Sequence, residues 1–222
     1  TLLLMDKLEK EKIIAYVGKV GMDRNSPDYY IESNGEEETI RFIKESIKKN
    51  YQYVYPIITP RFTPSVSDNY MLSLANIANN YNLPVQSHLS ENNKEIELEK
   101  ELRPNDITYL ESYIKPGLVN KNRKAIMAHC IYCSDYEKAL IKENNIYIAH
   151  SPTSNVNTLA GICPAKEYLN DNFNIALASD VAGGNTLDMF EVLKCAIISS
   201  KVYKKFKNSQ ILTLSFSEAF SS

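Results

Sequence analysis

Short apolar runs alternate with helical patterns along this chain, and that alternation restricts the fold more than any other feature. Helical spacing or a capping signature marks residues 36–50, 65–82 and 134–145. Apolar residues on successive positions predict strands covered on both faces, as in a parallel sheet. A strand followed by a helix, repeated, predicts right-handed βα units and an α/β fold. The apolar runs cover residues 13–20, 54–60, 84–89, 125–130, 146–151 and 175–180.

Six such strands fit either an open doubly wound sheet or most of an eight-stranded barrel. No glycine-rich turn follows a strand, which disfavours a nucleotide-binding sheet. In a barrel, chemistry gathers at the carboxyl ends of the strands, where His88, His129, His150 and Asp180 fall. We therefore predict a partial (β/α)8 barrel of the TIM type, forming one domain over residues 1–222 without a second domain.

The composition is that of a globular protein. The chain has 222 residues, 44% of them hydrophobic, and a formal net charge of −2, which gives no field to attract nucleic acid or an anionic membrane. No apolar run approaches the ~20 residues of a membrane span. Four cysteines without a regular framework indicate a reducing cytoplasm. The start at Thr1 and the final helix start at "FSEAFSS" indicate a piece of a longer protein.

The three histidines of the chain each end an apolar run. A single histidine in a core strand is usually a packing residue. Three at equivalent strand ends, with Asp180 as a fourth polar group, point instead to a shared function. Imidazole nitrogens and a carboxylate suit a catalytic Zn²⁺ or Fe²⁺. Such an ion can lower the pKa of its bound water to ~7.

Glu91 follows His88 by three positions. Pro84 and the apolar run place His88 on a strand, and the next helix begins after a cap at Asn92 or Asn93. Glu91 then lies in the connecting turn, where it can serve as a general acid and base beside a metal-bound water. A glutamate that complements the helix dipole is an equally good interpretation of the spacing.

Cys130 and Cys133 form a C-x-x-C motif. Zinc nucleobase deaminases pair H-x-E with P-C-x-x-C, whereas this chain has H-x-x-E and no proline before Cys130. A single C-x-x-C is weak evidence for zinc, and the thioredoxin-like context of a redox motif is missing. We expect two semi-buried thiols.

"ITPRFTPS" and "SDVAGGNT" end two further strands. Arg61 at a barrel mouth can donate to a carbonyl or an anion, and Phe62 can stack on a flat ring; a surface arginine is the alternative. After Asp180, Gly183 and Gly184 allow close backbone approach, although an aspartate that starts a turn gives the same pattern.

Together these segments resemble the guanine deaminases of the amidohydrolase superfamily. "H-x-S-E", "AH" and "SD" are typical of its metal-dependent deaminases in general, and "TPRF" and "SDVAGG" of the guanine enzymes. The matching segments span nearly the whole chain, in the family's order: "AYVGKVGMD", "ITPRFTPS", "QSHLSEN", "MAHCIY", "IAHSPTSN" and "ASDVAGG".

The resemblance implies a barrel whose third to eighth strands are present, with one catalytic Zn²⁺, or Fe²⁺ in its place. His88, His129 and Asp180 would be metal ligands, while His150 would support them or shape the mouth. The family's remaining ligands, an H-x-H pair at the end of the first strand, are absent from this sequence.

The implied reaction is hydrolysis of guanine to xanthine and ammonia by a metal-activated water. Glu91 and Asp180 would be the catalytic residues that move protons. The implied substrate contacts are Arg61 on the carbonyl side, Phe62 on the ring, and His88 and Asp180 beside the metal. The family habit implies a homodimer of the full-length protein. The segment alone would be inactive, since it lacks two ligands.

Three alternatives stay open. A related deaminase or chlorohydrolase could act on another purine, a pyrimidine, a pterin or a triazine. A barrel without its metal could bind purines or serve in an assembly. A C-x-x-C redox protein is the most distant. Metal content separates the second alternative from the enzymes, and thiol titration tests the third.

Overall fold

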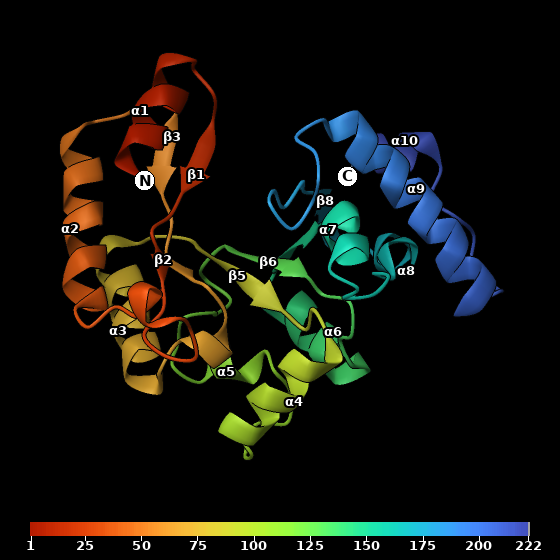
Figure 1. Cartoon of the computed structure of the whole chain (residues 1–222), viewed down its shortest axis with the longest axis horizontal. Helices are drawn as coiled ribbons and strands as arrows, with labels where there is room; N and C mark the ends of the chain where they lie inside the picture. Colours follow the sequence, from red (N-terminus) through yellow and green to blue (C-terminus); the bar gives the residue numbers. More distant parts are fainter. Residues whose placement is uncertain (222) are drawn as a thin grey trace. The chain divides into compact units, whose positions relative to one another are not determined.

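The structure, a computed structural model, describes residues 1–221 and divides into two compact units. The first unit comprises Thr1–Ser87 and Glu111–Ala125; the second comprises His88–Leu110 and residues 126–221. Figure 1 labels the helices and strands of the chain. The sequence predicts one domain over residues 1–222, and the division into two compact units does not test that prediction.

The first unit places α-helices beside short parallel strands. β1 pairs with β3 and β2 pairs with β4, both in parallel, and Ile58 forms a parallel bridge with Val85. β5 (Val85–Leu89) begins here and ends in the second unit. The other elements are α1 (Leu2–Lys10), β1 (Ala15–Val17), β2 (Val20–Gly21), η1 (Asp28–Tyr30), α2 (Gly35–Lys48), β3 (Val54–Pro56), β4 (Thr59–Pro60), η2 (Thr63–Ser65), α3 (Asp68–Tyr81) and α5 (Glu111–Ile114).

The first two predicted strands are each broken in two. Residues 13–20 give β1 and β2, and residues 54–60 give β3 and β4. At the first break, a Cβ on Gly18 would lie 1.9 Å from Oγ1 of Thr59. The segments that contain Gly18 and Thr59 therefore approach more closely than a side chain at position 18 would permit. In the partner run, Pro56 and Pro60 have no N–H to donate to a neighbouring strand. The sequence prediction of continuous strands was therefore wrong here.

Helices α2 and α3 lie side by side in the first unit (Figure 1). The helical spacing in residues 65–82 comes from apolar residues that are all buried on α3, which confirms this helix: Met71, Leu74, Ala75 and Ala78. On α2, the pattern of Ile40, Ile43 and Ile47 predicts only part of the buried face. Ile43 is buried with Phe42, but Ile47 is 53% exposed. The buried face of α2 is therefore displaced from the isoleucine stripe and also includes Thr39 and Ser46.

The second unit contains a four-stranded sheet with the order β5-β6-β7-β8. β6 pairs with β7 and β7 with β8, all in parallel, which confirms the predicted βα units. Helix α9 packs on α7, α10 and β8 (Figure 1). The elements are β6 (Ala125–His129), whose first residue belongs to the first unit, α4 (Asn93–Leu102), α6 (Asp135–Glu143), β7 (Tyr147–His150), α7 (Pro152–Asn157), α8 (Ala165–Asn170), β8 (Asn174–Leu177), α9 (Met189–Phe206) and α10 (Phe216–Phe220).

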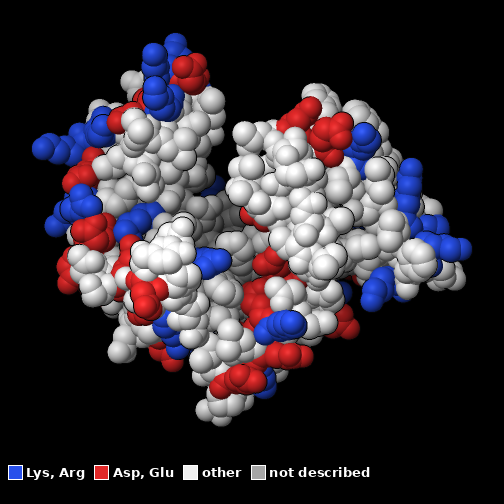
Figure 2. Space-filling model, in the orientation of Figure 1, with Lys and Arg blue, Asp and Glu red and all other residues white. Residues whose placement is uncertain are grey.

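The surface carries mixed charge. Figure 2 shows Lys and Arg together with Asp and Glu on the visible face of each unit, in line with the small net charge of the sequence. Within residues 1–221, no helix combines the length and the apolar character that a membrane crossing requires.

Candidate active site

The three histidines meet the same edge of the sheet in the second unit. His129 and His150 are the last residues of β6 and β7, and the parallel register pairs Ala128 with Ala149 just before them. His88 lies one residue before the end of β5, and its ring stacks on that of His129 with 5.2 Å between centroids. The predicted convergence of the strand ends is thus confirmed for these side chains.

Asp180 lies in a turn after the sheet. The predicted strand reached Asp180, but β8 ends at Leu177. The turn is closed by a hydrogen bond from the Gly184 amide to the Asp180 carbonyl, at 2.6 Å. A Cβ on Gly183 would lie 2.4 Å from Oγ of Ser154, and one on Gly184 would lie 2.1 Å from the Ser179 carbonyl oxygen. The two glycines are therefore needed for close approach, as the sequence predicts.

Four residues at this edge have left-handed backbone conformations. The φ angles are +49° at Ser90, +72° at His129, +48° at Cys130 and +46° at Asp180. For residues other than glycine this conformation costs roughly 1–2 kcal/mol each, and such strain is found most often at functional sites. The strained positions coincide with the ends of the strands that carry the predicted metal ligands.

Glu91 lies in the turn between β5 and α4, as predicted. Asn92 is the N-cap of α4, and its side chain accepts a hydrogen bond from the Glu95 amide at 3.0 Å. Glu91 therefore stands outside the helix, and the acidic residue in the first turn is Glu95. Oε2 of Glu91 lies 3.8 Å from Nε2 of His129, with 21% of the Glu91 side chain exposed. This position favours the acid–base interpretation over a helix-dipole role.

Nε2 of His129 faces two carboxylates. It lies 3.8 Å from Oε2 of Glu91 and 3.9 Å from Oδ2 of Asp180. On the other side of the ring, Nδ1 lies 2.8 Å from Oδ1 of Asn155. Since an amide oxygen only accepts, this contact requires a proton on Nδ1, and in the neutral form of the ring Nε2 then carries the lone pair. Three electron-pair donors that face one another repel, and a cation among them relieves that repulsion.

The donor chemistry therefore fits a divalent metal ion, since imidazole nitrogen and carboxylate oxygen are the donors that Zn²⁺ and Fe²⁺ use. Across the described residues, however, no three His, Cys, Asp or Glu side chains are arranged to hold a metal by themselves. The assignment of His88, His129 and Asp180 as ligands thus remains a prediction.

His150 is buried and uncharged. Burial, assisted by the neighbouring His129, lowers its pKa to about 4. Its Nδ1 has no hydrogen-bond partner among residues 1–221, and neither do Oγ of Ser151 and Oγ of Ser154. Buried polar atoms in proteins are nearly always satisfied. The segment after β7 therefore offers polar atoms that a bound molecule or water would pair.

Three glutamates of the second unit are buried, namely Glu95 and Glu99 on α4 and Glu137 on α6. Burial raises the pKa of Glu95 and of Glu99 to about 7. It also raises the pKa of Glu137, whose carboxylate accepts from Oγ of Ser90 and from the Leu110 amide, both at 2.8 Å. Sequence spacing predicts a capping box between Ser134 and Glu137. Only half of it forms, because Ser134 caps the helix while the glutamate side chain bonds elsewhere.

Arg61 and Phe62 belong to the first unit, directly after β4. The guanidinium carbon of Arg61 lies 5.3 Å from the centroid of the Phe62 ring, a cation–π distance. The Arg61 amide donates to the Gly21 carbonyl at 3.0 Å. The two side chains form a local pair on a fixed backbone, and their predicted contact with substrate is untested.

The long loop at 22–36 clamps the segment that follows Arg61. Asp23 accepts from the Ser67 amide at 2.7 Å, and its own amide donates to the Ser65 carbonyl at 3.0 Å. The guanidinium of Arg24 donates to the Thr63 carbonyl at 3.1 Å. Residues 22–36 are thus an ordered support for "TPRFTPS".

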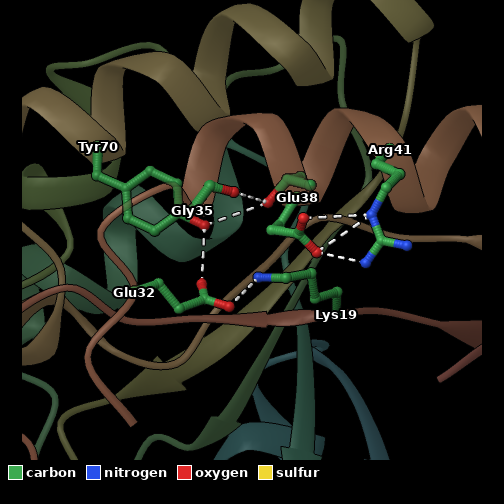
Figure 3. A network of polar contacts seen from close by, with 7 residues as sticks. Lys19, Glu32, Gly35, Glu38, Arg41 and Tyr70 are labelled. Atoms are coloured by element: carbon green, nitrogen blue, oxygen red, sulfur yellow. Dashed lines mark hydrogen bonds and ion pairs between the residues drawn. The ribbon is translucent and has the colours of Figure 1, made fainter. Parts of the chain in front are cut away.

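The end of this loop is anchored by the polar contacts in Figure 3. Lys19 donates to Glu32, and the hydroxyl of Tyr70 donates to the same carboxylate at 3.4 Å. Tyr70 also lies 3.1 Å from Oγ1 of Thr39 on α2. Burial, together with the nearby carboxylates of Glu32 and Asp23, raises the pKa of Tyr70. A Cβ on Gly35 would lie 2.5 Å from the Tyr70 ring, so glycine permits this packing.

The cysteines are free thiols, and those of the C-x-x-C motif are buried. Burial raises the pKa of Cys130 and Cys163 far above the usual value for a thiol. A raised pKa disfavours the thiolate that redox exchange requires. The two thiols of the motif are buried rather than semi-buried as predicted, and at Cys130 the raised pKa disfavours the redox interpretation.

Comparison with known proteins identifies the family. The model of the amidohydrolase family matches residues 2–219. The chain belongs to the amidohydrolase family. It is 37% identical over 220 residues to the guanine deaminase of Dictyostelium discoideum, an alignment that covers 98% of this chain and 48% of that protein. The chain thus spans about half the length of this relative.

Solved structures of deaminases also align with this chain. The guanine deaminase from C. acetobutylicum, crystallised with guanine in its active site, aligns with a TM-score of 0.92 at 43% identity, covering 99% of this chain and 52% of the other. An adenosine deaminase from Xanthomonas campestris with bound zinc aligns with a TM-score of 0.80 at 22% identity, covering 96% and 46%, which shows the fold alone. The fold class of this amidohydrolase chain is α/β, a partial barrel of the TIM type.

Sequence reasoning missed Asn155. The segment "IAHSPTSN" suggested a function only for its histidine, although the amide five residues later makes the 2.8 Å contact with His129. A buried polar residue close after a strand that ends in histidine was the available signal. Sequence reasoning also missed the hydrogen bonds of Asp23 with Ser65 and Ser67. The turn-forming composition of residues 22–36 gave no indication of them.

Proposed function

We propose that the full-length protein carrying this chain hydrolyses guanine to xanthine and ammonia with a bound Zn²⁺. The observation that carries the proposal is the position of Nε2 of His129, within 4 Å of both Glu91 and Asp180. Support for guanine comes from the guanine-bound relative at 43% identity, and support for zinc comes from the zinc-bound fold neighbour. Fe²⁺ satisfies the same donor chemistry.

His88, His129 and Asp180 would hold the metal. His88 and His129 would bind through ring nitrogens and Asp180 through its carboxylate. The ion would supply a water whose pKa is lowered to ~7. His150 is neutral because of its burial, so it would shape this side of the site without adding charge.

Glu91 and Asp180 would move the protons. Asp180 would take the proton from the attacking water. Glu91, in a turn outside α4, would protonate the ring nitrogen next to the carbon that bears the amino group, and then deliver a proton to the leaving ammonia. Water adds to that carbon and ammonia leaves it, so atoms and charge balance. General acid–base groups of this kind contribute typically ~10²–10⁴-fold to the rate.

Arg61 and Phe62 would recognise the purine. The guanidinium is a rigid donor suited to the carbonyl side of guanine, and the Phe62 ring offers an aromatic face for packing. The contact between the two side chains would hold both in place before the substrate arrives.

The experiment is a substrate panel with the full-length protein. Ammonia release and product absorbance are measured for guanine, adenine, cytosine, a pterin and a chlorinated triazine. The proposal predicts equimolar xanthine and ammonia from guanine, with kcat/KM at least ~100-fold above the others, as polar recognition allows. A preference for another member of the panel would retain the amidohydrolase chemistry and reject the guanine assignment.

We also propose that the full-length protein, with guanine as its small-molecule substrate, is a cytoplasmic homodimer. The free thiols support a reducing compartment. Light scattering of the purified protein and fractionation of the cells that produce it test the two statements separately.

A further inference from the structure

Asn155 is buried against the face of His129 that points away from the proposed metal. Its Oδ1 lies 2.8 Å from Nδ1 of His129, and both residues are 1% exposed. Because no bulk water reaches the pair, the Asn155 amide is the polar group that contacts Nδ1 of His129.

The backbone of Asn155 is fixed on both sides. Its amide donates to the Ser151 carbonyl at 3.0 Å, and its carbonyl accepts from the Ala160 amide at 2.9 Å. Pro152 begins α7 and presets its first turn. The adjacent pairing of β6 with β7 brings the start of α7 to His129. The backbone of Asn155 is therefore held in position before any ligand binds, while Nδ2 of its side chain has no hydrogen-bond partner among residues 1–221.

The two orientations of the amide correspond to two tautomers of His129. With Oδ1 toward the ring, Nδ1 is protonated and Nε2 is a lone pair. With Nδ2 toward the ring, Nδ1 accepts, and the proton moves to Nε2, where it would face Glu91 and Asp180. Only the first tautomer can bind a metal through Nε2. The structure has the first orientation.

We propose that Asn155 is a positioning residue that holds His129 in its Nδ1–H tautomer and thereby prepares Nε2 as a metal ligand. The inference rests on the metal site of the proposed function but not on the choice of substrate. Partners that orient ligating histidines typically contribute 10–100-fold to metal affinity.

The test uses the full-length protein and zinc alone. Ring ¹⁵N shifts of His129 are recorded in the metal-free wild type, and zinc Kd is measured by competition with a chromophoric chelator. The variants are Asn155→Leu, which removes the acceptor, and Asn155→Asp, which keeps it. Asn170→Leu, which alters an exposed asparagine on α8, is the matched control.

We expect an Nδ1–H signal in the wild type, a zinc Kd raised ~10–100-fold in Asn155→Leu, and affinities within a few-fold of wild type in Asn155→Asp and Asn170→Leu. An Nε2–H tautomer in the metal-free wild type would overturn the inference even if Asn155→Leu failed to fold. Wild-type zinc affinity in Asn155→Leu would overturn it as well. Zinc binding without guanine turnover would contradict the proposed function and leave this inference standing.

Discussion

Oε2 of Glu91 lies 3.8 Å from Nε2 of His129. That separation is too long for a direct hydrogen bond, so the carboxylate lies beside the ring nitrogen without bonding to it. His88 belongs to a strand, whereas Glu91 belongs to the turn that follows it. The two residues can therefore have different roles although they are close in sequence.

Glu91→Gln in the full-length protein should retain zinc and lose most turnover. The amide keeps the shape of the side chain but cannot shuttle a proton, so kcat should fall ~10²–10⁴-fold. Metal analysis and steady-state kinetics check this together. Glu97→Gln, at an exposed position on α4, is the control. Loss of zinc in the Glu91 variant would make Glu91 a ligand instead.

Arg61→Ala should weaken guanine turnover at unchanged metal content. A site built to hydrogen-bond a substrate group loses ~1–3 kcal/mol or more when the donor is removed. Arg41→Ala removes an exposed arginine that pairs with Glu38 on α2 and should leave kcat/KM unaffected. Equal kinetics in the two variants would mean that the segment "TPRF" supports the fold and does not contact the substrate.

Stability should fall with rising pH because of Glu95. Burial, opposed by a hydrogen bond from Tyr109 and reinforced by the charge of Glu91, raises its pKa from 4.5 to about 7. Between these values the folded state holds a proton that the unfolded chain has lost, so the free energy of unfolding declines with pH. Above about pH 7 this contribution is constant.

Glu95→Gln removes that dependence. Relative to wild type, its free energy of unfolding should improve by about 3 kcal/mol between about pH 4 and about pH 8. Denaturant titrations at both pH values measure the change, with Glu97→Gln as the control. Parallel pH profiles of wild type and Glu95→Gln would show that the carboxyl does not titrate in this window.

The 222-residue segment by itself should not deaminate guanine. Its sequence lacks an H-x-H pair, and among its described residues no three side chains form a metal-binding group. Because ligand number and supporting contacts both set metal affinity, zinc binding should be much weaker than in the full-length protein. Comparable zinc-dependent xanthine production by the two proteins would show that further ligands are unnecessary.

The sequence predicts the ends of β5, β6 and β7 well, because these three apolar runs stop at or next to a histidine and burial of such runs needs no long-range information. It predicts the position of Glu91 for the same reason, since Asn92 is a strong local cap. These features depend on a few neighbouring residues, so periodicity and capping preferences were sufficient.

Features that depend on tertiary contacts were not predictable. Glu137 leaves its capping box because Ser90 and the Leu110 amide, distant in sequence, offer buried hydrogen bonds. Asp180 lies beyond the end of its strand because the turn is held by Gly183 and Gly184 against α7. The contact of Asn155 with His129 likewise exists only once β6 and β7 have paired.

The most direct test of the central claim is guanine turnover as a function of bound zinc. The full-length protein is stripped with a chelator, reloaded in steps, and assayed for xanthine at each measured zinc content. The account predicts no turnover in the stripped protein and a rate that rises linearly to a maximum at one zinc per chain. Full turnover by the stripped protein would contradict the metal site formed around His88, His129 and Asp180.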